Sequence, residues 1–333
     1  MKRLMATRGN GEQREILVRA APSLALVKYW GKSDRRRNLP ATSSLAVTVT
    51  GLETEVRMCE ASGADHLTVD GVAVPAERHG TFFDAARSAV GSTTGYRAEA
   101  CNNFPGSAGL ASSASLFAAL AVGCGRMAGL DDSGSWRSRA SALARVGSAS
   151  AARAVWGGFS VLEAGAEAGA GAFPPDHWPD LRLLVAVTSR RRKPVPSREA
   201  MNHVAATSPY YDAWVAAADG TYRAALEAVR SRKLGRLGPL MRVSYLRMFG
   251  TMLAADPPIN YLRARSLRVL EVLERLREGG IDAWETMDAG PQVKIACLAP
   301  DVERIRAALL ADAGLAPADL IETAPGPGPR IVA

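Results

Sequence analysis

The segment from residue 101 to residue 115 is rich in small residues and runs directly into an apolar stretch that begins at Leu116. Gly106 and Gly109 allow the backbone to turn tightly, and nearby serines add hydroxyl groups to the amides exposed at the positive end of a helix. This composition is typical of a loop that binds phosphate groups, but a turn that only caps a helix has the same composition. The loop by itself leaves both interpretations open.

Three charged residues elsewhere offer acid, base or anion-binding chemistry. Lys28 is expected on an apolar strand, between Val27 and Tyr29, where an ammonium group is costly to bury without an anion, although a surface lysine can also extend its charge into water. Arg153 lies just after a Gly-Ser-Ala-Ser run that lets phosphate oxygens approach the backbone, or that only begins a helix. Asp288 precedes a glycine turn, as catalytic carboxylates often do, or only closes that turn.

The elements that must position these groups change in kind along the chain. In the first half, short runs of branched and polar residues predict strands at 15–19, 45–50, 53–58, 67–74, 96–101, 159–162 and 181–187, with helices at 81–90, 115–127 and 135–145. In the second half, longer helical periodicity predicts helices at 209–229, 233–254 and 261–278, followed by strands at 283–287 and 293–298 and a helix at 302–311. The expected fold class is α+β.

Other segments predict loops and a boundary. The segment 164–172 is nearly all alanine, glycine and glutamate, which predicts a flexible surface loop. Charge and proline interrupt the pattern between residues 188 and 196, so we expect two lobes, at 1–187 and 188–333. The closing run 325–329, rich in proline and glycine, predicts a turn before a final short strand.

Composition limits the classes of function. The chain has 333 residues, of which 47% are hydrophobic, and this is enough for one large core or two smaller ones. It shows neither an apolar membrane span nor the apolar centre of a signal peptide near its start, so we expect a cytoplasmic protein. The four cysteines form no C-x-x-C pair, and the four histidines lack metal-ligand spacing, so the sequence argues against a disulfide framework and against a zinc site.

The formal net charge of +8 has three explanations, which are binding to nucleic acid, to an anionic membrane surface or to small anionic substrates. Basic clusters stand out at 35–37 and 190–193, but neither alternates with aromatic residues as surfaces for single-stranded nucleic acid often do. Composition alone does not separate the three explanations.

Six motifs occur in one order along the chain, and these are KYWGK, LPxxSS, NNFPxxAGLASSA, GSxSAxR, SRxxM and TMDAGP. In this order they resemble the motifs of the diphosphomevalonate decarboxylase family, which belongs to the GHMP kinase superfamily. The matching segments extend from about residue 22 to residue 291. The resemblance implies a two-lobed GHMP kinase-like fold, with an N-terminal lobe like ribosomal protein S5 domain 2 and a helix-rich, ferredoxin-like C-terminal lobe.

The resemblance also implies an ATP-dependent decarboxylation of (R)-5-diphosphomevalonate that yields isopentenyl diphosphate, carbon dioxide, ADP and phosphate. By this likeness Asp288 orients or deprotonates the 3-hydroxyl group, Lys28 keeps Asp288 ionised, and Arg153 binds the carboxylate that departs. The residues that match substrate-binding positions of the family are Tyr29, Lys32, Ser148, Ser150, Ser197, Arg198 and Met201. Those that match nucleotide-binding positions are Pro105, Gly109, Leu110, Ala111, Ser112 and Ser113, and Ser113 also matches a position that reaches the Mg²⁺ bound with ATP.

Further expectations from the resemblance are small-molecule partners, no nucleic acid, no membrane and a homodimer. Three positions depart from the family pattern, because Ser23 and Gln292 each replace a usual asparagine and Ala152 replaces a common cysteine. None of the three removes a charge from the proposed centre, so they bear on rate and exact substrate more than on reaction class. Three alternatives stay open, which are decarboxylation of the 5-monophosphate, phosphorylation of the 3-hydroxyl group of mevalonate or its phosphate without decarboxylation, and nucleic-acid binding.

Overall fold

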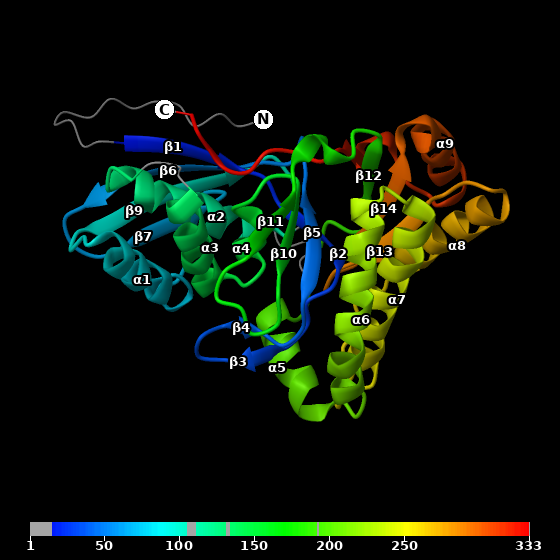
Figure 1. Cartoon of the computed structure of the whole chain (residues 1–333), viewed down its shortest axis with the longest axis horizontal. Coiled ribbons are helices and arrows are strands. Elements are labelled where there is room, and N and C mark those ends of the chain that lie inside the picture. The colour runs from blue at the N-terminus through cyan, green and yellow to red at the C-terminus, as the bar shows by residue number, and fades with distance from the viewer. Residues whose placement is uncertain (1–14, 105–110, 131–133, 192, 333) are drawn as a thin grey trace.

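The first half of the chain is built on a six-stranded sheet in the order β16-β1-β6-β9-β7-β8. The structure is a computed structural model that describes residues 15–104, 111–130, 134–191 and 193–332 (Figure 1). The strands of this sheet are β1 (Glu15–Ala20), β6 (Thr54–Ala61), β7 (His66–Val69), β8 (Val72–Ala73), β9 (Gly95–Asn102) and β16 (Arg330–Ile331). Burial alternates along β1 and β6, so one face of the sheet covers a core.

On that buried side lie α1 (Gly80–Val90), α2 (Ser112–Met127), α3 (Gly134–Gly147) and α4 (Ala151–Ala154) (Figure 1). α2 packs directly on β1 and β6, and α3 and α4 pack on α2. α2 is almost wholly buried, and its small residues let it lie close to β1 and β6. Gly123 shows the reason, because a Cβ atom there would come within 2.3 Å of the Met58 sulfur. The small residues that follow the predicted phosphate loop therefore also serve packing.

The second half contains a four-stranded sheet in the order β13-β14-β12-β15, with helices packed on both of its faces (Figure 1). Its strands are β12 (Leu181–Ala186), β13 (Trp284–Met287), β14 (Val293–Leu298) and β15 (Leu320–Thr323). The α-helices of this half are α5 (Ser197–Thr207), α6 (Tyr211–Arg230), α7 (Leu234–Leu253), α8 (Ala264–Glu278) and α9 (Val302–Asp312). Short 3₁₀ turns in the described chain are η1 (Ala76–Arg78), η2 (Pro175–His177), η3 (Ala299–Asp301) and η4 (Pro317–Asp319).

A third sheet, ordered β11-β10-β5-β2, joins the two halves. Its strands are β2 (Ser23–Val27), β5 (Ser44–Thr48), β10 (Phe159–Leu162) and β11 (Ala170–Phe173). All five residues of β2 are buried, and the apolar side chains of β2 and β5 share one hydrophobic core with β12, α6 and α7. A hairpin of β3 (Lys32–Asp34) and β4 (Leu39–Pro40) follows β2. This shared core places the end of β2 beside the second half of the chain.

The expectation of a flexible surface loop at 164–172 is wrong for its second part, which is packed, whereas residues 164, 165 and 167 are exposed and lie outside any helix or strand. β11 begins at Ala170 and pairs with β10, and the Gly169 N–H donates to Ser141 Oγ over 2.9 Å. A Cβ atom at Gly169 would lie within 2.9 Å of the Ala152 carbonyl oxygen, so the small residue permits close backbone approach. Alanine and glycine occur both in flexible linkers and in tight contacts, and composition does not distinguish them.

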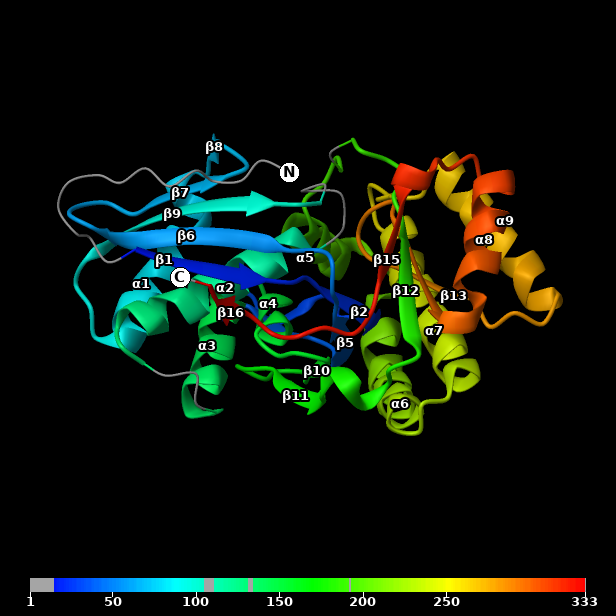
Figure 2. The same cartoon turned by 90° about the horizontal axis from the view of Figure 1, so that it is seen from above.

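The C-terminal segment crosses back to the first sheet, as Figure 2 shows from above. Gly326 N–H donates to Thr48 O, and Gly158 N–H donates to Gly326 O, each over 2.8 Å. β16 then pairs antiparallel with β1. The predicted final strand is confirmed, but the predicted turn at 325–329 is wrong, because this run passes along the first half in an irregular conformation that begins with a β-bridge at Pro325. The segment ties the second half to two sheets of the first.

The expected α+β class is confirmed, with two local corrections. Lys28 lies one residue beyond the end of β2 instead of inside a strand, and α5 occupies a stretch where no helix was predicted. The lobe boundary at 187 and 188 stays a prediction; among the described strands, β12, just before it, pairs with β14 and β15 of the second half. Among the helices in the described ranges, none is both long enough and apolar enough to cross a membrane.

Candidate active site

Asp288 lies directly after β13, between two buried lysines. Lys28 Nζ is 2.7 Å from Asp288 Oδ1, and Lys294 Nζ, from β14, is 2.9 Å from Asp288 Oδ2. Lys28 Nζ also donates to the Ala25 carbonyl oxygen over 2.7 Å, and the Lys28 backbone N–H donates to Ser244 Oγ on α7 over 2.8 Å. The ends of β2 and β13 are therefore joined through an ion pair at the junction of the two halves.

The two ammonium groups keep the Asp288 carboxylate ionised. Burial by itself raises the pKa of Asp288, but the charges and hydrogen bonds of Lys28 and Lys294 outweigh burial and hold this pKa well below its usual range. Burial lowers the pKa of Lys28 to about 8, against the opposing attraction of Asp288. The Asp288 carboxylate is thus negative at neutral pH.

Arg153, on α4, is a buried cation with unused hydrogen-bonding capacity. It is 2% exposed, and its Nε and Nη1 atoms have no hydrogen-bond partner among the described residues. Burial lowers the pKa of Arg153 to about 10, while the Asp288 charge acts in the opposite direction, so the group stays charged at neutral pH. Buried unpaired donors are costly, which favours an anionic ligand here. The hydroxyl group of Tyr29 is also buried without a partner in the described part.

A second group of cations and hydroxyl groups lies at the β3–β4 hairpin, the α3–α4 turn and the start of α5. Lys32 Nζ donates to Asn38 Oδ1, and burial, then the charges of Arg198 and Arg145, lower the pKa of Lys32 to about 7. Arg198 Nη2 donates to the Gly147 carbonyl oxygen over 2.8 Å. The hydroxyl groups of Ser148 and Ser150 are 3.0 Å apart. Such a concentration of donors suits a phosphorylated ligand.

The start of α2 meets this second group. Ser113 Oγ lies 3.3 Å from Ser148 Oγ, so the predicted nucleotide and substrate residues adjoin. Ala111 has a left-handed backbone with φ of 57°, which is uncommon for a residue with a Cβ atom, and Ser112 begins the helix directly after it. The predicted residues Pro105, Gly109 and Leu110 lie outside the described ranges.

Hydrogen bonds connect the start of the segment between β12 and α5 to the residues that follow Asp288. Gln292 Oε1 accepts the backbone N–H groups of Thr188 over 2.6 Å and Ser189 over 3.3 Å, and Thr188 Oγ1 donates to Pro291 O over 2.6 Å. Further along, Lys193 Nζ donates to Ser197 Oγ over 2.6 Å and to the carbonyl oxygen of residue 289 over 3.1 Å. Gln292 thus links the Asp288 turn to the segment that precedes α5.

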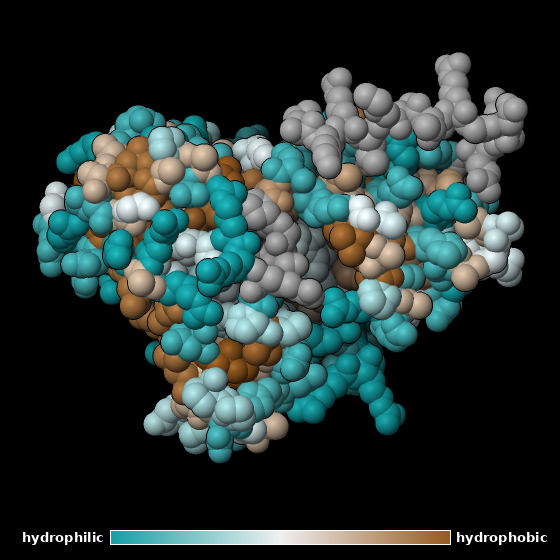
Figure 3. Space-filling view, turned by 180° about the vertical axis from the view of Figure 1, so that it is seen from behind, coloured by the Kyte–Doolittle hydropathy of each residue, from teal (hydrophilic) through white to brown (hydrophobic). Residues whose placement is uncertain are grey.

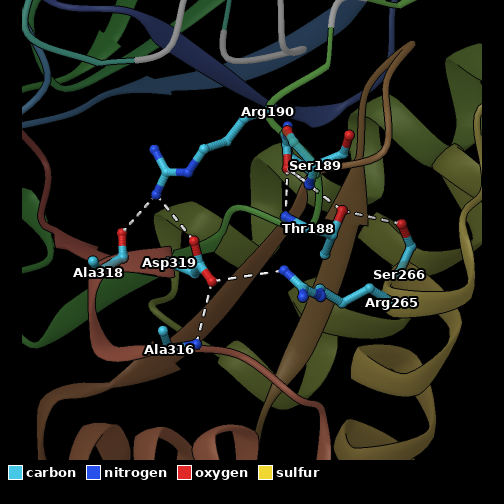
Figure 4. A network of polar contacts seen from close by, with 9 residues as sticks. Thr188, Ser189, Arg190, Arg265, Ser266, Ala316, Ala318 and Asp319 are labelled. Atoms are coloured by element: carbon cyan, nitrogen blue, oxygen red, sulfur yellow. Dashed lines mark hydrogen bonds and ion pairs between the residues drawn. The ribbon is translucent and has the colours of Figure 1, made fainter.

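Figure 4 shows a second attachment of the same segment. Arg190 reaches Asp319 Oδ1 over 3.0 Å, and Arg265 Nη1 lies 3.7 Å from Asp319 Oδ2 (Figure 4). Thr188 Oγ1 is 3.2 Å from Ser266 Oγ at the start of α8. The basic cluster at 190–193 is therefore partly structural.

Sequence reasoning missed Lys294 and did not assign Lys193 to the site. The signal was present, because Lys294 stands between Val293 and Ile295 in an apolar run, which is the same kind of context that singled out Lys28. Met201 is buried in the core of the second half. Its predicted contact with substrate, like the other predicted binding roles, stays a prediction.

The other two residues that depart from the family pattern, Ser23 and Ala152, are both buried. Ser23 is buried at the start of β2, and its Oγ has no hydrogen-bond partner among the residues described. Ala152 packs with Ala149 and Leu162 in a small cluster beneath the site. Neither contributes a charge.

Comparison with known proteins indicates one family for both halves of the chain. The family model for the diphosphomevalonate decarboxylase-like N-terminal domain matches residues 20–173, and that for the mevalonate 5-diphosphate decarboxylase C-terminal domain matches residues 183–332. A diphosphomevalonate decarboxylase of Eremothecium gossypii is 32% identical over 314 residues, which cover 86% of this chain and 78% of that protein. The chain belongs to the diphosphomevalonate decarboxylase family.

Solved structures similar to this member of the diphosphomevalonate decarboxylase family share its whole fold. Mevalonate diphosphate decarboxylase from Staphylococcus aureus has a TM-score of 0.88 at 31% identity, over 96% of this chain and 98% of that chain. A structure described as MDDEF in complex with MVAPP, AMPPCP and magnesium has a TM-score of 0.87 at 30% identity, over 96% and 98% of the two chains. The expected two-lobed GHMP kinase-like fold is confirmed.

Proposed function

We propose that this protein catalyses the ATP-dependent decarboxylation of (R)-5-diphosphomevalonate to isopentenyl diphosphate, with release of carbon dioxide, ADP and phosphate. One observation carries the proposal beyond family membership. Asp288 is held ionised between two buried lysines, and its charge interacts with that of Arg153, a buried guanidinium group whose Nε and Nη1 have no partner in the part of the chain that the structure describes. These are the groups that the reaction needs for orienting a hydroxyl group and binding a carboxylate.

Asp288 orients the 3-hydroxyl group of the substrate for transfer of the γ-phosphoryl group from ATP. A carboxylate whose pKa lies this far below its usual range is a weak base at neutral pH. The low pKa therefore supports orientation over proton uptake as the role of Asp288. Lys28, which contacts the same carboxylate, balances the charge of the transferred phosphoryl group.

Arg153 binds the carboxylate of the substrate through its planar guanidinium group. Once the 3-hydroxyl oxygen is phosphorylated, phosphate leaves with the electron pair of its bond to C3. The electrons of the bond between C1 and C2 then form the new double bond, and carbon dioxide departs. Water must be kept away from the electron-poor carbon at this stage, and two of the groups proposed to contact the substrate there, Arg153 and Lys28, are buried.

The diphosphate end of the substrate binds at the second group of cations and hydroxyl groups. Lys32 and Arg198 supply charge, Tyr29, Ser148, Ser150 and Ser197 supply hydroxyl donors, and Met201 supplies an apolar contact to the substrate. Several cations favour a diphosphate over a monophosphate, because each phosphate group brings further negative charge. The experiment below distinguishes the diphosphate from the monophosphate as the substrate.

ATP binds at the start of α2, where the first backbone N–H groups of a helix and the hydroxyl groups of Ser112 and Ser113 suit phosphate oxygens. Pro105, Gly109, Leu110 and Ala111 complete the proposed nucleotide site. Mg²⁺ prefers oxygen ligands, and the Ser113 hydroxyl group offers one beside those of the phosphates and water. When bound, the ion neutralises phosphate charge.

The proposal is tested by incubating the purified protein with ATP and Mg²⁺ and with mevalonate, its 5-phosphate or its 5-diphosphate in turn. We expect equal amounts of carbon dioxide and ADP with the 5-diphosphate alone. Release of ADP without carbon dioxide identifies a 3-hydroxyl kinase, and release of both from the monophosphate identifies a monophosphate decarboxylase. Salt-dependent binding to oligonucleotides without turnover would favour nucleic acid.

We also propose a cytoplasmic homodimer, as the resemblance implies. Figure 3 shows hydrophobic areas on the rear face, and Val243, Leu246 and Leu253 of α7 are large apolar residues that stay exposed. Such residues offer contact area to a second copy. Light scattering of the purified protein tests this proposal, and the mass of a single chain rejects it.

A further inference from the structure

Lys294 places an ammonium group in the buried interior of a sheet, where a charge is energetically costly. β14 is paired on both sides, with β12 and β13, and the residues before and after Lys294 are fully buried. An apolar side chain of similar length would fit such a strand at lower cost, because a buried ammonium group loses its hydration. The stability of the sheet therefore does not explain the presence of a lysine here.

The register of the β13–β14 hairpin brings Lys294 to Asp288. Lys294 stands opposite Thr286, and side chains two residues apart along a strand point to the same face, so Lys294 and Asp288 are diagonal neighbours. Lys294 Nζ is 2.9 Å from Oδ2, and Lys28 Nζ is 2.7 Å from Oδ1. Each carboxylate oxygen therefore has an ammonium group of its own, and the two come from different halves of the chain.

Lys28 and Lys294 lie on different elements, and their positions indicate different roles in the reaction. Lys28 follows β2 in the KYWGK motif, and the proposed reaction brings a phosphoryl group beside it, which competes with Oδ1 for its ammonium protons. We infer that Lys294 is a positioning residue that retains Oδ2 of Asp288 and so fixes the carboxylate while Lys28 bonds to phosphate. This inference rests on the proposed function.

The charges around Asp288 predict what removal of Lys294 does. Asp288 faces Lys28 after β2, Lys294 on β14, Arg153 on α4 and Lys193 before α5. Burial raises the pKa of Asp288, and Lys294 is one of the two charges that oppose burial most strongly. Without Lys294 this pKa rises, so the carboxylate takes up a proton and activity falls as the pH is lowered.

The test compares Lys294→Met, which keeps side-chain length without charge, with Lys294→Arg. Displacement of a reacting group by about 1 Å costs about 100-fold in rate, and we expect a loss of that order in kcat for Lys294→Met, with the KM for ATP little changed. We also expect kcat/KM to fall toward acidic pH in Lys294→Met but not in the wild type. Lys294→Arg keeps the charge and retains activity within about tenfold of wild type.

Arg277→Met is the matched control, because Arg277 forms an ion pair of 2.7 Å with Glu285 on β13. Glu285 lies on the face of the strand opposite Asp288. The control is expected to lower thermal stability and to leave the pH profile unchanged. A Lys294→Met protein with kcat within twofold of wild type and an unchanged pH profile overturns the inference, and so does the same pH shift in Arg277→Met.

A second measurement does not depend on the folding of Lys294→Met or on turnover. The Asp288 carboxyl carbon is followed by ¹³C NMR in Lys28→Met, with Asp288→Asn to assign the signal. Because Lys294 still holds Oδ2, we expect Asp288 to stay ionised at about pH 6 in Lys28→Met. A protonated Asp288 at that pH overturns the inference, whereas failure of the wild type to release carbon dioxide rejects only the proposed function.

Discussion

Replacement of Asp288 by asparagine tests the centre of the proposed site. The change keeps the shape of the side chain and removes the negative charge between Lys28 and Lys294, each of which has a side chain no more than 2% exposed. Loss of a positioned catalytic group costs about 10²- to 10⁴-fold in rate. At about 1.4 kcal/mol per tenfold, this corresponds to about 3–6 kcal/mol of transition-state stabilisation.

The same change also affects stability. Leaving a buried charge without its partner costs about 3–5 kcal/mol, and the two lysines that lose the carboxylate are both buried, so we expect the free energy of unfolding to fall by about that amount. Substrate binding is expected to stay within a few fold of wild type, because both ammonium groups remain to attract the anionic substrate. The variant therefore separates chemistry from binding.

The assay follows carbon dioxide and ADP at saturating substrate, with calorimetry for binding and urea unfolding for stability. Asp282→Asn is the matched control, since Asp282 is exposed just before β13 and bonds to the indole of Trp284 over 3.0 Å. We expect the control to turn over normally. A turnover of Asp288→Asn within tenfold of wild type refutes the role given to Asp288.

Three further predictions concern the neighbouring groups. Arg153→Lys is expected to lower kcat by about 10- to 100-fold, because an ammonium group cannot make the two-point contact of a guanidinium group, and a near-normal rate of carbon dioxide release argues against carboxylate binding by Arg153. Lys32 binds phosphate in its protonated form and has a pKa of about 7, so the Kd for the diphosphate substrate should rise as the pH increases through that value, while Lys32→Arg removes this pH dependence in calorimetry. Gln292→Ala leaves the buried N–H of Thr188 without its acceptor, so the free energy of unfolding in urea should fall by about 1–3 kcal/mol, and an unchanged value contradicts the anchoring role.

Much of the site was predictable because its residues stand in ordered motifs. Lys28, Arg153 and Asp288 were each singled out by a charge in an apolar or glycine-rich context, although each context also allowed a structural explanation. Their order along the chain matched a family, whereas no single segment was decisive. The structure adds that Lys28 and Asp288 are in contact across 260 positions of sequence.

Other features were not predictable from local pattern. β11 formed in a segment whose alanine and glycine content predicted a flexible loop, because small residues also permit backbones to approach closely. α5 was missed because charged residues and proline just before Ser197 obscured its start. In both places neighbours distant in sequence decide the conformation.

The sequence by itself determined the reactive groups, the α+β class and the family, since these depend on residue types and on their order. Only the tertiary structure decided which charges share a partner. The register of the β13–β14 hairpin places Lys294 at Oδ2 of Asp288, and the core shared by β2, β12 and α7 brings Lys28 to Oδ1. A lysine in an apolar run is costly to bury unless an anion pairs with it, and the sequence alone does not show which anion the fold brings within 3 Å.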